Sequence, residues 1–276
     1  MALQNVAVIR LLQDRLVWYP PGASQEPRAL DDEVARQALR ATVAQRRTRV
    51  CFAVPGFDAR LLCLSVSAAE KKHINRSLPF MLEEEVATDI EELHFAHCAL
   101  DRESIAVAVC ARERMDAWRD LLVDFPGVAQ WLPEPLLLPW REGEWCLVVE
   151  GDTLILRCGP CDGFTIERDM LAPVLAALLA ERDKPDAVVV YGTDQDADTA
   201  LLPEALQSRV QWRRGNLYTA MLIADSGASK LNLLQGSYAP RLPLGRWWRQ
   251  WRAVAACFAI AFALQLAALY ADYRNL

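Results

Sequence analysis

The two cysteines of the run Cys158-Gly159-Pro160-Cys161 have the spacing of a thiol–disulfide redox site. In thioredoxin-type sites a helix begins at such a motif, and its N-terminus lowers the pKa of the first thiol. Here strand patterns flank the motif, at 154–157 and 164–167, so the spacing predicts a hairpin turn instead. A zinc site would need a second C-x-x-C or a pair of histidines, which the sequence lacks. We therefore expect neither redox nor metal chemistry, and the redox alternative is left to experiment.

The remaining thiols and imidazoles form no recognisable catalytic arrangement. A free thiol on an apolar strand behaves as a small core side chain in a reducing cytosol. Five cysteines fall in such patterns: Cys51, Cys63, Cys98, Cys110 and Cys146. His94 and His97 are three residues apart on an expected strand, so they point to opposite faces and cannot share a metal. With no glycine-rich phosphate loop either, the sequence predicts no catalytic, cofactor-binding or metal-binding residue, and no cofactor.

The elements that carry these residues alternate between strands and helices. Apolar alternation and turn residues predict strands in the first half at 5–12, 15–19, 49–54, 60–67, 93–100 and 104–111. Apolar residues at helical spacing predict helices at 31–47, capped by Asp31 or Asp32, at 68–88, interrupted by Pro79, and from 113 to about 125.

The second half repeats this plan. Three strands are expected at 145–150, 153–157 and 164–167, followed by a helix capped by Asp169, a continuously apolar strand at 187–191, and helices at 198–208 and 217–225. Each half opens with antiparallel strands and continues with α/β crossovers. We therefore predict an α/β fold with two lobes, roughly 1–140 and 141–240, that resembles the actin and ribonuclease-H-like folds, although periodicity alone supports several α/β architectures.

The C-terminal part has the pattern of a membrane anchor. Ala253 to Ala271 is a run of 19 residues whose only strongly polar side chain is Gln265. As a helix it is about 28 Å long, close to the hydrocarbon thickness of a bilayer. Before it stands a collar of residues that favour the headgroup layer: Arg246, Trp247, Trp248, Arg249, Trp251 and Arg252. We predict a transmembrane helix at 253–271, a juxtamembrane collar at 241–252 and a periplasmic stub at 272–276.

Charge predicts the orientation and excludes one class of partner. Four arginines precede the expected span and only Arg274 follows it, so the positive-inside rule places the N-terminal domain in the cytosol, and residues 1–20 have no secretory signal pattern. The last 36 residues carry five arginines and one aspartate, which leaves a net charge of −10 on residues 1–240 of a chain whose net charge is −6. An acidic domain argues against nucleic-acid binding, and we expect only the collar to be attracted to membrane lipid.

Two further patterns suggest contact surfaces. Alanines recur every four residues in the expected span, at Ala255, Ala259, Ala263 and Ala267, and such a stripe lets helix backbones approach closely. An alanine-rich face turned to lipid is an equal alternative. Acidic residues gather after Pro79, among them Glu83, Glu84, Glu85 and Asp89. Such a run is either a docking surface for a partner or a solvated helix face, and the charge pattern alone favours the second.

Two stretches carry a resemblance to a known family. One runs from Leu78-Pro79-Phe80-Met81-Leu82-Glu83-Glu84-Glu85-Val86-Ala87 to Ala96, and the other is Leu231-Asn232-Leu233-Leu234-Gln235-Gly236-Ser237-Tyr238-Ala239-Pro240-Arg241, directly before the collar. Both resemble the L component of the bacterial type II secretion system, and the layout of a cytosolic domain followed by one span is similar too. In that family a periplasmic domain follows the span, whereas five residues follow it here.

The resemblance implies a scaffold of the bacterial inner membrane whose actin-like cytosolic domain has no enzymatic activity. It implies recruitment of the cytosolic secretion ATPase, the E component. It also implies assembly with the M and C components and the polytopic F component of the membrane platform, and with further copies of the chain itself.

An actin-like fold raises the question of ATP. Active members of that fold hold phosphate and magnesium with a short acidic and glycine-containing turn after the first strand of each half. At the first position this chain has Val8-Ile9-Arg10-Leu11-Leu12-Gln13, without glycine or acid, and at the second Glu150-Gly151-Asp152 reads as an ordinary hairpin turn. We expect no nucleotide hydrolysis. The alternatives are a sugar-kinase-like ATPase and the soluble, nucleotide-binding actin-like protein of type IV pilus assembly.

Overall fold

The computed structural model describes residues 6–21, 26–45, 48–125, 127–223 and 231–240, with six further positions at 257, 258, 261, 262, 264 and 265. The chain divides into two compact units, Met1–Tyr238 and Ala239–Leu276. Among the described residues no helix has the length and apolarity to cross a bilayer. Most of the expected span at 253–271, with its four alanines and the collar from Arg246 to Arg252, lies outside the described residues and stays a prediction.

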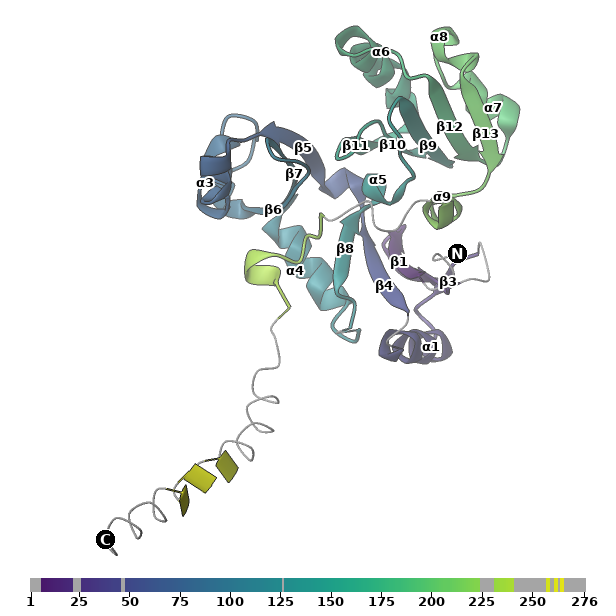
Figure 1. The fold of residues 1–276 in the computed structure, drawn as a ribbon. Helices are drawn as coiled ribbons and strands as arrows, with labels where there is room; N and C mark the ends of the chain where they lie inside the picture. Colours follow the sequence, from purple (N-terminus) through teal and green to yellow (C-terminus); the bar gives the residue numbers. More distant parts are fainter. Residues whose placement is uncertain are drawn as a thin grey trace, which may run out of the picture. The chain divides into compact units, whose positions relative to one another are not determined.

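A five-stranded sheet forms the first half of unit 1 (Figure 1). Its strands are β1 (Val6–Leu12), β2 (Arg15–Tyr19), β3 (Arg28–Ala29), β4 (Arg49–Val54) and β8 (Gln130–Pro133), in the order β3-β2-β1-β4-β8. β1 pairs antiparallel with β2, and parallel with β4, which is parallel to β8. The predicted Gln13-Asp14 turn is confirmed, and both residues have positive φ, 49° and 61°, as a two-residue hairpin turn with the right twist requires.

The second half contains a sheet of the same plan. Its strands are β9 (Glu144–Glu150), β10 (Thr153–Arg157), β11 (Gly163–Glu167), β12 (Ala187–Gly192) and β13 (Val210–Arg214), in the order β11-β10-β9-β12-β13. Again the first three strands are antiparallel neighbours, and the last two run parallel to the first. The predicted duplication, with antiparallel strands followed by α/β crossovers, is confirmed.

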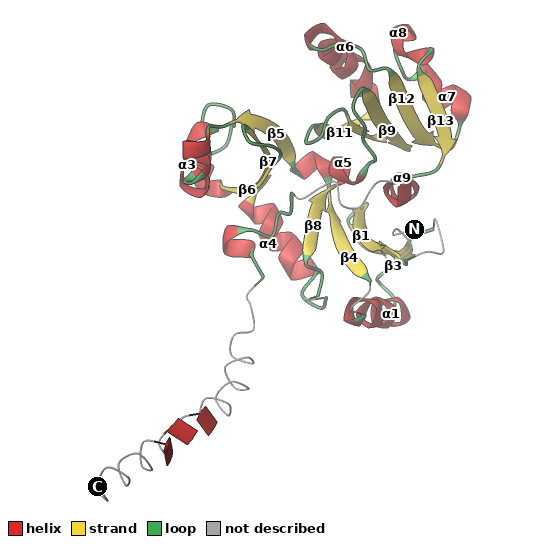
Figure 2. Cartoon of the chain, viewed as in Figure 1, coloured by secondary structure: helices red, strands yellow, loops and turns green. Residues whose placement is uncertain are grey.

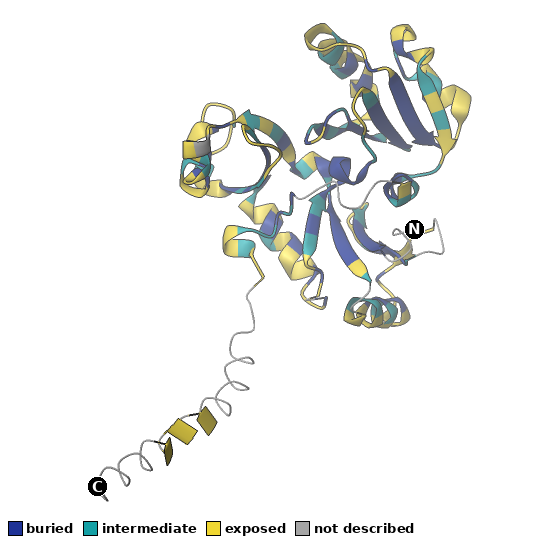
Figure 3. Cartoon of the chain, viewed as in Figure 1, coloured by how far each residue is buried: buried dark blue, intermediate teal, exposed yellow. Residues whose placement is uncertain are grey.

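Helices cover both faces of the two sheets (Figure 2). α1 (Glu33–Ala44) and α4 (Arg112–Leu121) pack on one face of the first sheet. α6 (Leu171–Glu181) and α8 (Glu204–Gln207) pack on one face of the second, with α7 (Gln195–Ala200) beside β13. The inner faces of both sheets share one apolar core with α5 (Glu134–Leu137) and α9 (Leu217–Ile223). The strands are accordingly buried over most of their length, while the outer helix surfaces are exposed (Figure 3).

A smaller sheet is inserted between β4 and α4. β5 (Arg60–Ser65), β6 (Leu93–Ala99) and β7 (Ser104–Ala111) form an antiparallel sheet in the order β5-β7-β6. α2 (Ala68–Lys71) begins at a capping box formed by Ser67 and Glu70, and α3 (Ile74–Met81) packs Ile74 and Leu78 on the sheet. The short helical turns η2 (Gly56–Asp58) and η3 (Ile90–Glu92) precede β5 and β6.

Several sequence predictions are corrected by this fold. The helix predicted at 68–88 is two short helices, α2 and α3, which separate at Lys72 and His73. The predicted interruption at Pro79 is wrong, because Pro79 lies inside α3. α3 ends at Met81, because three consecutive carboxylates at a helix C-terminus oppose the helix dipole. The helix predicted at 198–208 is also two, separated at Pro203, which cannot continue a helix. Asp169 does not cap α6: it lies within the turn η4 (Arg168–Met170), and α6 begins at Leu171. Three strands were not predicted, β3, β8 and β13.

Candidate functional site

A cleft of about 910 Å³ opens where the two halves of unit 1 meet. The β1–β2 hairpin contributes Leu11 to Asp14, the β9–β10 hairpin contributes Glu150 to Thr153, and η2 and Arg114 lie along the rim. Arg10, Glu134 and Tyr19 form its deeper part. The two positions at which an actin-like ATPase would hold phosphate, the segment ending at Gln13 and the Glu150-Gly151-Asp152 turn, are far apart in the chain but line the same cleft.

The floor of the cleft is a buried ion triad. Arg10, from β1, donates to Glu134 Oε1 from Nε at 2.9 Å and from Nη2 at 2.8 Å, and from Nη1 to Glu150 Oε2 at 2.8 Å. Glu134 starts α5, and its Oε2 accepts the N–H of Gly56 at 3.2 Å. Glu150 ends β9, and its Oε1 accepts the N–H of Leu217, in α9, at 2.8 Å. One guanidinium thus joins the first sheet to the second through carboxylates from both halves.

The electrostatics of the triad follow from its burial. Arg10 is 2% exposed and Glu134 5%. Burial alone would lower the pKa of Arg10, but the charges of Glu134 and Glu150 outweigh it and raise that pKa above its ordinary value. Burial raises the pKa of Glu134, against the opposing effect of the Arg10 charge. Arg10 and Glu134 therefore stabilise each other, since removal of either one would leave the other as a buried, unpaired charge and would destabilise the folded state.

The remaining charges of the cleft disfavour phosphate. Its lining holds five carboxylates, Asp14, Asp58, Glu134, Glu150 and Asp152, and two guanidiniums, Arg10 and Arg114. Both guanidiniums are already paired, since Arg114 binds Asp58 through two hydrogen bonds of 3.0 and 2.8 Å. A nucleotide without a metal ion would bring several negative charges to these carboxylates, and no unpaired cation among the lining residues would receive them.

The C-G-P-C motif encloses a second buried cation. The predicted hairpin is confirmed, because β10 pairs antiparallel with β11 around it. Arg157, 2% exposed, donates to the carbonyls of Gly159 at 3.1 Å and Pro160 at 2.8 Å, inside the motif. It also donates to the carbonyls of Leu136 and Leu138, at the end of α5, at 3.0 and 2.7 Å. Its hydrogen-bond partners among the described residues are uncharged carbonyls, and burial lowers the pKa of Arg157 to about 10. The turn is shaped around this guanidinium.

The two thiols of the motif are poor nucleophiles in this setting. Burial, with the charge of Asp162, raises the pKa of Cys158 to about 12 despite the nearby Arg182. Cys161 is buried beside Cys63, and burial raises its pKa as well. Reactive cysteines need the opposite shift. Among the described residues no group of three His, Cys, Asp or Glu side chains is placed to hold a metal ion.

The segment Leu231–Tyr238, which we call the strap, attaches the end of unit 1 to two sheets. At β8, Leu233 donates its N–H to the carbonyl of Trp131 at 3.0 Å, and Asn232 Oδ1 accepts the N–H of Trp131 at 2.9 Å. At β6, the side-chain amide of Gln235 bonds both backbone groups of His97, at 3.2 and 3.0 Å. Leu231 and Leu233 are buried in the core under α1 and α4. Sequence reasoning singled out this stretch as a family motif but not its structural role.

Two aromatic side chains complete the attachment of the strap. His94 Nε2 lies 2.7 Å from the carbonyl of Leu233, and because a carbonyl only accepts, this nitrogen carries a proton. Burial lowers the pKa of His94, so the ring is neutral at pH 7. The Tyr238 ring packs edge-on against it at 4.9 Å, and its hydroxyl lies 3.2 Å from Asp116 Oδ1 in α4. The strap therefore contacts β8, β6 and α4 together.

The acidic residues singled out in the sequence are not among the residues that line the cleft. Glu83, Glu84 and Glu85 are exposed in the turn after α3 rather than on a helix. Glu85 is 3.4 Å from Arg60, an exposed pair of little energetic weight. Asp89 accepts the N–H of Glu91 and so begins η3. These four side chains form an exposed surface of the small sheet's connecting segment.

Comparison with known proteins gives a consistent answer. The family model of type II secretion system protein L matches residues 14–241. Protein L of Pectobacterium carotovorum subsp. carotovorum is 28% identical over 248 residues, which are 88% of this chain and 56% of that protein. Protein L of Vibrio cholerae is 27% identical over 212 residues, 76% of this chain and 51% of that protein. The chain thus spans about half the length of the curated relatives it matches.

A solved structure shows the same fold. The cytoplasmic domain of EpsL, an inner-membrane component of the type II secretion system of Vibrio cholerae, superposes with a TM-score of 0.63 and 21% identity. The match covers 84% of this chain and 99% of that domain. At this identity the likeness establishes the mixed α/β fold alone.

Replacing Arg10 by Met should destabilise the folded chain by about 3–5 kcal/mol, because it leaves the buried Glu134 and the half-buried Glu150 without their cation. This loss in the free energy of unfolding should become smaller as the pH falls from 7.5 to 5.5. Without Arg10, the folded-state pKa of Glu134 rises further above its unfolded value, so the folded state binds protons more tightly and gains stability as pH falls. Urea unfolding of the full chain at both pH values measures this. Arg76→Met, at an exposed site, is the matched control, and a small pH-independent loss for Arg10→Met would contradict the role of the triad.

Cys158 should resist alkylation. A pKa raised from 9.0 to about 12 lowers its thiolate fraction at pH 8 by about a thousandfold, and only the thiolate reacts. Peptide mass spectrometry after timed exposure to iodoacetamide measures the rate, with the exposed Cys63 as the internal reference. Labelling of Cys158 as fast as Cys63 would restore the redox interpretation of the motif.

Proposed function

The chain belongs to the type II secretion system protein L family, and we propose that it is a non-enzymatic platform component that recruits the cytosolic secretion ATPase to the inner membrane. The observation that carries this proposal is the match of the family model over residues 14–241. Proteins of that name are components of a secretion system, and the solved relative is described as an inner-membrane component.

The fold we propose is actin-like, in the ribonuclease-H-like class. Its support is the repeated strand order, in which three antiparallel strands are followed by two parallel ones on the other side of the first strand, in both halves. The cleft between the halves corresponds to the place where an actin-like ATPase would hold its nucleotide. In this chain Arg10 and its two carboxylates occupy the floor of that cleft, which supports a scaffold rather than an ATPase.

The membrane arrangement we propose is a single span at 253–271 with the N-terminal domain in the cytosol. The collar from Arg246 to Arg252 anchors the span at the inner surface, and the stripe of Ala255, Ala259, Ala263 and Ala267 packs against a neighbouring helix. The M, C and F components and further copies of the chain are the proposed neighbours. The strap supports this arrangement, because it fixes the last described residues before the collar to two sheets of unit 1.

For the ATPase we propose the exposed acidic turn as part of the docking surface. Glu83, Glu84 and Glu85 carry three negative charges on a turn, with only Glu85 engaged in an ion pair. Charges at the rim of an interface raise the association rate and make it sensitive to salt, while a buried apolar centre sets the lifetime. Asp89 extends the same acidic stretch toward β6.

The rival function, a nucleotide-binding protein of the type IV pilus assembly type, makes a different prediction. We expect millimolar ATP with magnesium to leave the melting temperature of the full chain unchanged, because a ligand that binds only the folded state must raise it. Differential scanning fluorimetry measures this. A rise of several degrees would favour the rival.

The full chain, in detergent, should bind the secretion ATPase of the same system. Reversing Glu83, Glu84 and Glu85 to Lys should slow association by about tenfold at low salt and flatten its salt dependence, with little effect on folding because the three side chains are exposed. Biolayer interferometry at several salt concentrations measures both.

The matched control reverses three exposed acids elsewhere, Glu181, Asp183 and Glu204, and should bind like the wild type. Equal kinetics for all three proteins would remove the acidic turn from the interface. No binding by the wild type would overturn the proposed function.

A further inference from the structure

The outermost parallel strands of the two duplicated sheets differ in whether another segment is hydrogen-bonded to their outer edge. β8 and β13 occupy equivalent positions, at the end of the order in each sheet. The outer edge of β8 is covered by the chain itself: the strap bonds Trp131 through both its N–H and its carbonyl, and Asn232 Nδ2 donates to the carbonyl of Ala129 at 3.0 Å. The outer edge of this fifth strand is therefore covered by an extended apolar segment of the same chain.

In the described part of the chain no segment pairs its backbone with the outer edge of β13, and α7 packs beside this strand. β13 pairs with β12 alone, and the bonds from Val188 N–H to the Arg209 carbonyl and from Gly215 N–H to the Gly192 carbonyl fix which residues face inward. Because the backbone groups alternate along a strand, those of Val210, Trp212 and Arg214 face outward. A row of such groups is a template for an added strand.

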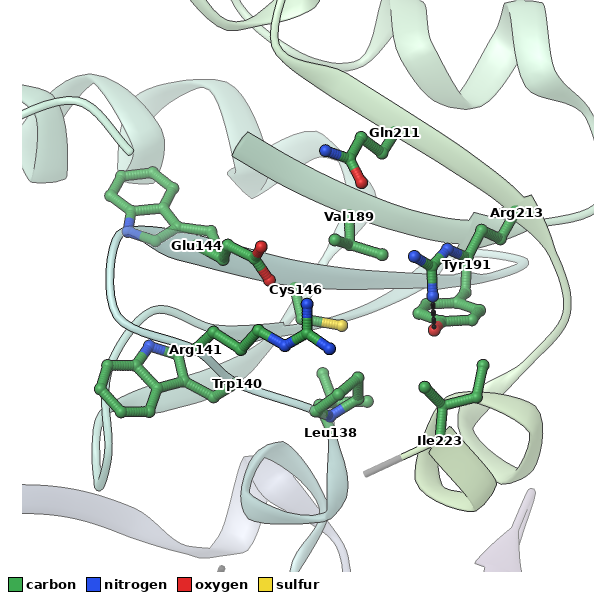
Figure 4. Close-up of a pocket in the computed structure, with 12 residues that line it drawn as sticks. Leu138, Trp140, Arg141, Glu144, Cys146, Val189, Tyr191, Gln211, Arg213 and Ile223 are labelled. Carbon is green, nitrogen blue, oxygen red and sulfur yellow. Dashed lines mark hydrogen bonds between the residues drawn. The ribbon is translucent and has the colours of Figure 1, made fainter. Parts of the chain in front are cut away.

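A pocket of about 290 Å³ lies on one face of this sheet, where residues of β9, β12 and β13 line it (Figure 4). Gln211 and Arg213 reach it from β13, and Val189 and Tyr191 from β12, while Arg141 extends toward it from the segment after α5. The guanidinium of Arg213 donates to the Tyr191 hydroxyl at 3.2 Å and lies 5.9 Å from the centre of the ring.

The charges along β13 favour an acidic occupant, because Arg213 and Arg214 are both exposed on this strand; the pocket beside it is lined by Arg141 and by one carboxylate, Glu144. Arg141 and Arg213 make no ion pair with any described residue, in a chain that carries a net charge of −10 over residues 1–240. Arginines on an edge strand also discourage aggregation simply by staying solvated. That explanation does not account for Arg141, which lies outside the strand, or for the apolar wall that Leu138, Val189 and Ile223 give the pocket.

We propose that the outer edge of β13 accepts an extended segment of a partner protein as a sixth strand. Side chains of Gln211 and Arg213 lie on the pocket face of β13, whereas Val210 and Trp212 pack on the opposite face with the α6–α8 core. The added strand therefore carries carboxylates on the face next to Arg213, and apolar side chains next to Val210 and Trp212 on the face that these two share with the exposed Arg214. This surface is separate from the acidic turn, and the proposal does not depend on the ATPase.

The probe is a fluorescent peptide of sequence Ser-Val-Glu-Leu-Asp-Ile-Glu-Val-Ser, compared with the same peptide carrying Lys at the three acidic positions. Fluorescence anisotropy with the full chain in detergent should show binding of the acidic peptide only. The double variant Arg141→Glu with Arg213→Glu should weaken the acidic peptide at least tenfold and bind the Lys peptide instead. The control pair Arg76→Glu with Arg102→Glu, both exposed, should change the affinity less than twofold.

Strand addition itself is tested at Arg214, whose N–H faces outward. Arg214→Pro removes this donor and should weaken the acidic peptide about tenfold more than Arg214→Gln, which keeps it. Equal effects of the two substitutions, no binding of the acidic peptide, or equal binding of both peptides would each overturn the proposal. Self-association of the wild-type chain that is lost in the double Glu variant would assign the edge to a second copy and overturn the partner-protein assignment.

Discussion

Arg10 lies where the two sheets meet, and its guanidinium is almost fully removed from water. Such a charge needs hydrogen-bond partners that compensate for its burial, and the two carboxylates that satisfy it come from different halves, Glu134 at the start of α5 and Glu150 at the end of β9. The carboxylates in turn hold Gly56 and Leu217 by their N–H groups. A shift of one half against the other would therefore break bonds in β1, α5, η2 and α9 together. The two halves are also tightly packed at Gly56, where an added side chain would collide with Thr165 of β11.

Arg157 supplies a second cation of the same kind, satisfied in a different way. Its described partners are four carbonyl groups, two in the C-G-P-C turn and two at the end of α5. α5 is thus bound at its start by Arg10 and at its end by Arg157, one arginine from each half. A domain whose lobes are joined by its own side chains has no need of a ligand to hold them, which agrees with a scaffold as the proposed function.

The strap extends this rigidity toward the C-terminus. Side-chain amides of Asn232 and Gln235 take the place of strand partners, and buried leucines fix the segment against the first sheet. Backbone edges at β8 and β6 are satisfied by this one segment, so force applied at its end would reach two sheets at once. On the proposed membrane arrangement, the strap is the element through which the cytosolic domain and the span would act on each other.

The sequence by itself determined the duplicated α/β plan, the Gln13-Asp14 hairpin, the buried strand β12 and the family, because these depend on local periodicity, turn residues and contiguous motifs. The tertiary structure alone decided the rest. β8 and β13 are four and five residues of mixed polarity, and they are strands because β4 and β12 offer them an edge. Arg10 and Arg157 read in the sequence as polar interruptions of apolar strands, and the acidic turn read as a helix. Their partners lie up to 140 residues away, and no local pattern encodes a contact that forms only when two halves of a chain close on each other.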